Sequence, residues 1–173
     1  MRYEILTFLN RWKCRLSRAA TAPLLRDWIT QNESALENLH DLSILDDRVP
    51  ERTQELNDLY RSVIDFKSRG IGNMSDAAAS KILHVLRPRL FVMWDSNIAP
   101  RFGLAYRDFA YGAFIRGMHR FALRLKDIAP DSAAGDVENY LNARLKYSIR
   151  KTLAKYLDEY NWYVAFGYQR MSH

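Results

Sequence analysis

Apolar residues recur at intervals of three and four along most of this 173-residue chain. That spacing gathers them on one face of an α-helix. It is found in residues 3–18, in segments that follow Pro23 and Pro50, and in the long segments 106–126 and 136–160. No stretch alternates apolar and polar residues for long enough to predict a sheet. We therefore predict an all-α fold, a compact helical domain of about six to eight helices.

The length of the chain suits one domain with a hydrophobic core of its own. We expect residues 1–173 to form a single all-helical domain. Alternatively, the chain forms two lobes, one of residues 1–68 plus the C-terminal helix and one of residues 69–135. The aromatic tail, residues 161–170, is compatible with a β-strand, and we expect it to dock on the core or on a second copy of the chain.

Cysteine content and hydropathy exclude several classes of protein. Cys14 is the only cysteine, so the chain has neither an internal disulfide nor a four-cysteine zinc or iron–sulfur site. No apolar run approaches the roughly 20 residues of a membrane span. An export signal needs an uninterrupted apolar region, and Glu4, Asn10 and Arg11 lie where that region would have to be. We therefore expect a cytoplasmic protein with no membrane span, no metal and no cofactor.

Charge is distributed unevenly along the chain, which carries a formal net charge of +6. Residues 27–58 hold nine acidic and two basic side chains, whereas residues 81–126 hold nine basic and two acidic ones. Residues 144–155 add five basic side chains and no acid. A positive face attracts polyanions, so DNA is the predicted partner. Alternatively, these charges are the solvated outer faces of helices.

Two glycines flank an apolar residue at Gly70-Ile71-Gly72, between two predicted helices. Glycine permits the sharp turn that this position requires, and the amide groups that open the second helix are then free to bind a phosphate. Lys67 and Arg69 add positive charge beside them. The pattern predicts a central helix-hairpin-helix that binds the DNA backbone, or else a plain turn between two helices.

The second of these helices carries Lys81 and His84 one turn apart, and the chain then returns through a buried apolar run, residues 90–94, that ends at Asp95. A carboxylate paired with either cation would stay ionised, as a general base requires. We interpret Asp95, Lys81 and His84 as candidate catalytic residues. Alternatively, they form an internal ion pair that fixes the apolar run on the helix, with Trp94 in the core.

These features resemble the helix-hairpin-helix DNA glycosylases, which combine a glycine-apolar-glycine hairpin, a helix of small residues and a later aspartate. In this chain the matching pieces are Gly70-Ile71-Gly72, the helix that contains Ala77–Ala79, and Asp95. The resemblance implies that the aspartate assists attack on the sugar carbon of a flipped nucleotide. Members that also cleave the strand add a lysine early in the second helix, where this chain has Met74. Simple base removal is therefore the activity that the resemblance implies.

We therefore predict a DNA-binding protein that resembles these glycosylases and excises damaged bases with Asp95 as the acid–base residue. Arg116 and Arg120 lie four residues apart on the outer side of the 106–126 helix and join the predicted DNA contacts. His119, beside them, is expected to face solvent. Two other functions stay open. One is a non-enzymatic module that associates with proteins or with itself through its C-terminal aromatic segment, and the other is an enzyme that uses the same three catalytic candidates on a small phosphorylated substrate.

Overall fold

The computed structural model describes residues 2–12, 14, 16–68, 76–105, 110–130 and 136–170, with side chains for all of these except residues 2, 3, 67, 68 and 167–170. Within these ranges every regular element is a helix, which confirms the all-α prediction. The elements are α1 (Arg2–Arg11), α2 (Arg18–Gln31), α3 (Glu33–Glu37), α4 (Thr53–Ser68), α5 (Asp76–Leu86), the 3-10 helix η1 (Ala99–Phe102), α6 (Tyr111–Asp127), α7 (Val137–Leu145) and α8 (Leu153–Arg170).

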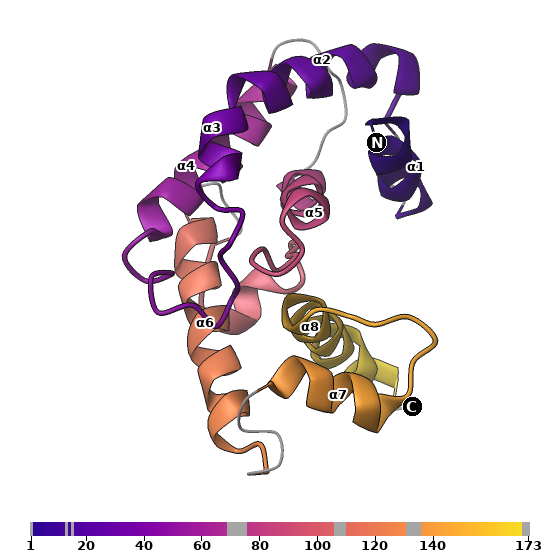
Figure 1. The fold of residues 1–173 in the computed structure, drawn as a ribbon. Helices are drawn as coiled ribbons and strands as arrows, with labels where there is room; N and C mark the ends of the chain where they lie inside the picture. Colours follow the sequence, from indigo (N-terminus) through magenta and orange to yellow (C-terminus); the bar gives the residue numbers. More distant parts are fainter. Residues whose placement is uncertain are drawn as a thin grey trace.

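Helix α5 lies near the centre of the molecule, with the other helices around it (Figure 1). Helices α3, α4 and α6 lie on the left of α5, α2 runs above it, α1 lies on its right, and α7 and α8 lie below it in this view. Helix α4 packs against both α5 and α6, and α1 packs against α2 and α5. One cluster of buried apolar side chains contains residues from all eight of the described α-helices.

Three aromatic rings fix an extended segment, residues 90–95, in the middle of this core. The rings of Tyr60 and Tyr111 stack with their centroids 4.1 Å apart. The indole Nε1 of Trp94 donates to the Tyr60 hydroxyl at 3.0 Å, and the Tyr111 hydroxyl donates to the Val92 carbonyl at 2.9 Å. All three rings are buried, and these bonds satisfy their polar ends. The segment is therefore held in one position although it belongs to no helix.

The N-terminal helix is shorter than the periodicity of residues 3–18 predicts, so that prediction was wrong beyond Arg11. The side-chain amide of Asn10 closes a turn on Leu16: its Nδ2 donates to the Leu16 carbonyl at 2.9 Å and its Oδ1 accepts from the Leu16 amide at 2.7 Å. Ser17 then caps α2 by accepting from the Ala20 amide. Apolar spacing continued across the turn because both sides of it pack on the same core.

The C-terminal region is two helices, not one helix followed by a strand-like tail. Helix α7 ends where Lys146 adopts a left-handed backbone conformation, with φ of 48°. The amide of Asn142 spans the break, because its Nδ2 donates to the Lys151 carbonyl and its Oδ1 accepts from the Lys151 amide, both at 2.8 Å. Helix α8 then continues through the aromatic tail to Arg170. Thr152 accepts from the Lys155 amide at the start of α8, and the helix extends through residues whose composition alone suits a strand.

His119 is buried, and the expectation that it faces solvent was wrong. Its side chain is 4% exposed, and its Nδ1 lies 2.8 Å from the carbonyl oxygen of Ile44, to which it donates. That carbonyl belongs to the turns between α3 and α4, whose backbone groups need partners where they meet α6. None of the described helices has the length and apolar character needed to cross a membrane.

Candidate functional site

A cavity of about 360 Å³ opens between the end of α1, helix α5, residues 93–98 and helix α8. Its volume lies within the range of about 300–1,000 Å³ that is usual for small-molecule sites. We call it the tryptophan cavity, because three tryptophans are among the residues that line it. The residues that line it are Arg11, Trp12, Lys81, Met93, Trp94, Asp95, Ile98, Asp158 and Trp162.

Two of the three predicted catalytic candidates, Lys81 and Asp95, line this cavity. His84 is not among the residues of its wall. Its side chain is 7% exposed, and its Nδ1 donates to the carbonyl oxygen of Phe91 at 2.7 Å. Burial lowers the pKa of His84, so the neutral imidazole is favoured. His84 therefore holds the extended segment through the Phe91 carbonyl, and only Lys81 and Asp95 of the three candidates line the cavity.

Asp95 is fixed by its own backbone neighbours. Its Oδ1 accepts from the amides of Asn97 at 2.8 Å and Ile98 at 3.0 Å, so it caps the turn that leads into η1. Among the described residues, Asp95 forms no ion pair with Lys81 or His84, and the predicted internal ion pair is absent. The carboxylate is held by one oxygen at the surface end of the buried segment and lines the cavity.

The other side of the cavity contains charged groups that the sequence reasoning missed. Two cations lie near the ring of Trp12: the Nζ of Lys155 is 4.5 Å and the Nζ of Lys81 is 5.3 Å from its centroid. Lys155 also donates to the Oδ2 of Asp158 at 2.6 Å. The available signal was the three-residue spacing of Lys155 and Asp158, which is that of a pair on one helix face.

Asp158 is the most buried acid at this site, with 6% of the residue exposed. Burial raises the pKa of its carboxyl group, and the nearby Lys155 opposes that rise in part.

Cys14 is also buried, with its Sγ 4.0 Å from the Nζ of Lys81. Burial raises the pKa of the Cys14 thiol, so the thiol stays protonated near neutral pH and is a poor nucleophile.

The predicted DNA contacts lie elsewhere or outside the described residues. Arg116 and Arg120 are exposed on α6, which contributes no residue to the wall of the tryptophan cavity. The guanidinium of Arg116 donates to the Thr53 hydroxyl at 2.7 Å. The side chain of Lys67 and all of Arg69, Gly70 and Gly72 fall outside the described residues.

The tryptophan cavity combines groups that suit a planar, polar ligand. Trp12 and Trp162, which are not buried, offer aromatic surface for stacking, Lys81 and Arg11 offer positive charge, and Asp95 offers a carboxylate held in a fixed orientation. Across the described part of the chain, no group of three or more histidine, cysteine, aspartate or glutamate side chains is placed to bind a metal ion. Comparisons with protein-family models, with curated proteins and with solved structures found no match for this chain.

Proposed function

We propose that this protein binds DNA and receives one unpaired nucleotide in the tryptophan cavity, where Asp95 assists removal of its base. The observation that carries the proposal is that Asp95 and Lys81 line one cavity together with indole rings. An enzyme that reacts with a nucleobase must take that base out of the stack and hold it in a pocket, by stacking and by hydrogen bonds. The likeness of residues 70–97 to helix-hairpin-helix glycosylases supports the same reaction.

The orientation of Asp95 suits a role as general base. Its Oδ1 is occupied by two backbone amides, and its Oδ2 has no hydrogen-bond partner among the described residues. In the proposed reaction Oδ2 takes a proton from a water molecule whose oxygen bonds to the sugar carbon C1′. The bond between C1′ and the base breaks, and the base leaves with the bonding electrons and is protonated by solvent. Lys81 would attract an adjoining phosphate.

The substitution Asp95→Asn tests this role without disturbing the cap. Asparagine keeps the Oδ1 acceptor for the two amides and removes the negative charge. We expect base release from an oligonucleotide with a damaged base to fall by about 100-fold or more, with DNA affinity retained. The control is Asp136→Asn, because Asp136 likewise caps a helix, accepting from the Asn139 amide at 2.9 Å, and does not line the cavity.

Base release at the wild-type rate in Asp95→Asn would contradict the catalytic part of the proposal. The binding part is tested by affinity at several salt concentrations. Contacts with several phosphates require the affinity to fall steeply as salt rises. A wild-type protein that retains no DNA at low salt, single-stranded or duplex, would contradict the whole proposal.

A second function, self-association through α8, is favoured by the exposure of its aromatic side chains. Tyr160, Trp162 and Tyr163 are 51%, 55% and 52% exposed. Aromatic residues are enriched at protein interfaces, because they bury a large area at a small entropic cost. Sedimentation at increasing protein concentration tests this function: a rise in mass that Trp162→Ala abolishes would support it, and a constant monomer mass would contradict it.

A further inference from the structure

Aromatic rings from three elements meet along one side of α6. Phe102 of η1 lies with its ring centroid 5.4 Å from that of Phe114, and Tyr160 of α8 lies 5.2 Å from Phe121. Phe114 and Phe121 are two helical turns apart on α6, with Gly117 between them. A Cβ atom added at Gly117 would meet no atom within 4 Å, so the space above it is open. We call these five residues the aromatic strip.

The rings at both ends of the aromatic strip are accessible. Phe102 is 39% exposed and Tyr160 is 51% exposed, whereas Phe114, which Phe102 packs against, is buried. The guanidinium of Arg101 donates to the Ala165 carbonyl at 3.1 Å and thereby ties η1 to α8. A hydrogen bond therefore joins the two elements that carry the exposed rings.

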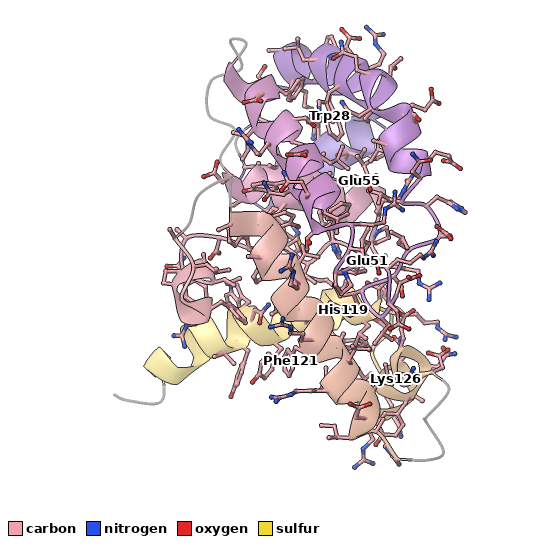
Figure 2. All side chains as sticks on the ribbon, turned by 90° about the vertical axis from the view of Figure 1, so that its left-hand side faces the viewer. Trp28, Glu51, Glu55, His119, Phe121 and Lys126 are labelled. Carbon is pink, nitrogen blue, oxygen red and sulfur yellow. The ribbon has the colours of Figure 1, made fainter. Side chains whose placement is uncertain are left out.

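Helix α6 carries positive charge beside the aromatic strip at Arg120 and Arg124, whereas Arg116 bonds to Thr53 of α4. Helix α6 carries four basic side chains, Arg116, Arg120, Arg124 and Lys126, all exposed, and its only acid is Asp127 at the last position. Arg120 precedes Phe121 directly, and Arg124 follows it by one turn. Figure 2 shows the labelled Phe121 where α6 crosses α8, with Lys126 further along the same helix. Accessible rings beside a row of arginines complement unpaired bases joined by phosphates.

We infer that the aromatic strip binds single-stranded DNA, with bases stacked on Phe102 and Tyr160 and phosphates against the arginines of α6. Unpaired bases present their faces to such rings, whereas the bases of a duplex are already stacked on one another. The inference rests on the proposed function and names its substrate class: DNA that is single-stranded around the target nucleotide. Helix α8 links the two sites, because Tyr160 belongs to the aromatic strip and Trp162 lines the tryptophan cavity.

The test compares a fluorescent oligothymidylate with a duplex of the same length, using the full chain and fluorescence anisotropy. We expect the single strand to bind more tightly and Tyr160→Ala to weaken its binding by at least about fivefold. Tyr160→Trp keeps an aromatic face and should restore the affinity. The matched control is Tyr147→Ala, since Tyr147 is also 51% exposed but is not part of the aromatic strip.

Equal affinities for Tyr160→Ala, Tyr147→Ala and the wild type would overturn the inference, and so would a duplex that binds as tightly as the single strand. A loss of self-association in Tyr160→Ala with unchanged DNA affinity would assign the ring to a protein interface and would also overturn it. A wild type that binds no DNA in either form would overturn the proposed function and this inference together. Base release by a protein whose affinity is indifferent to Tyr160 would contradict this inference alone.

Discussion

The hydroxyl oxygen of Ser80 lies 3.3 Å from the backbone nitrogen of Trp94 and accepts its hydrogen bond. The same oxygen lies 3.2 Å from the Trp94 carbonyl oxygen, and Ser80 is completely buried. One small side chain of α5 therefore fixes the end of the extended segment. Because Lys81 and Asp95 are the residues that follow Ser80 and Trp94 in sequence, this contact brings them to the same cavity.

We predict that Ser80→Ala destabilises the protein by about 1–3 kcal/mol, because the buried amide of Trp94 loses its acceptor. Chemical denaturation measures this change. Ser62→Ala is the control. The Ser62 hydroxyl also accepts a hydrogen bond from a tryptophan, Trp28, but Ser62 belongs to α4 and does not line the cavity. Both variants should lose stability, and only Ser80→Ala should alter ligand binding at the cavity. Equal effects on binding would show that Ser80 does not position Asp95.

The two described glycines of α6 should respond to alanine in opposite directions. A Cβ atom at Gly112 would lie 2.7 Å from the backbone oxygen of Thr53, and the Gly112 amide donates to Asn57 at 2.9 Å. Gly112→Ala should therefore destabilise the protein by about 1–3 kcal/mol as α4 and α6 are forced apart. Gly117→Ala meets open space and should stabilise it by up to about 1 kcal/mol, through helix propensity. Thermal unfolding of both variants checks the pair, and a stable Gly112→Ala would contradict the packing.

His84 should make the stability depend on pH below neutrality. Burial lowers its pKa from the ordinary value of 6.5, so the unfolded chain takes up a proton before the native protein does. The stabilising contribution of the neutral imidazole is present above pH 6.5 and is lost as the pH falls through the native pKa. His84→Gln keeps a donor for the Phe91 carbonyl and cannot titrate. Denaturation between pH 7.5 and pH 5 should show a smaller loss of stability in this variant, and equal slopes would refute the assignment.

The Lys155–Asp158 pair should control the protonation of the cavity. Burial raises the pKa of Asp158 above its ordinary value of 3.8, and Lys155 lowers it. A native pKa above the unfolded one means that this carboxyl stabilises most below pH 3.8, and that the contribution is lost as the pH rises through the native pKa. Lys155→Met should raise the native pKa of Asp158 further and cost up to about 3 kcal/mol at neutral pH.

A carbon NMR titration of the Asp158 carboxyl group measures this pKa directly. Lys151→Met is the matched control, because Lys151 pairs with Glu159 at 2.8 Å and not with Asp158. Its substitution should leave the Asp158 titration unchanged. An Asp158 pKa that stays constant or falls in Lys155→Met would mean that the observed pairing does not govern its charge.

Much of the local structure could be predicted from the apolar spacing. Helix α5 ends two residues before Pro88, as the position of that proline indicates. Helix α4 begins three residues after Pro50, so Pro50 is not in its first turn, and Pro23 lies inside α2 and not at its start. The breaks that were missed depend on contacts of single side chains with the backbone nine and six residues further along the chain. The Asn142 amide that bonds to Lys151 has a counterpart in the Asn10 amide that bonds to Leu16, and neither contact leaves a periodic signal.

The candidate site was predictable only in part. Lys81 and Asp95 were singled out because the sequence places a cation on a helix and an acid after a buried run. Trp12 and Asp158 carried no comparable signal, since a tryptophan at helical spacing is ordinarily a core residue and an acid beside a lysine is ordinarily solvated. Their position in the cavity depends on how α1 and α8 approach α5.

The sequence by itself determined that the chain is helical, because the spacing of apolar residues is a property of each segment alone. It also determined that residues 90–94 are buried, because exposing five consecutive apolar side chains to water is unfavourable. Only the tertiary structure decided which charged groups share the tryptophan cavity. That choice depends on hydrogen bonds such as Ser80 to Trp94 and on rings that meet across helices, and both join positions that the chain order leaves far apart.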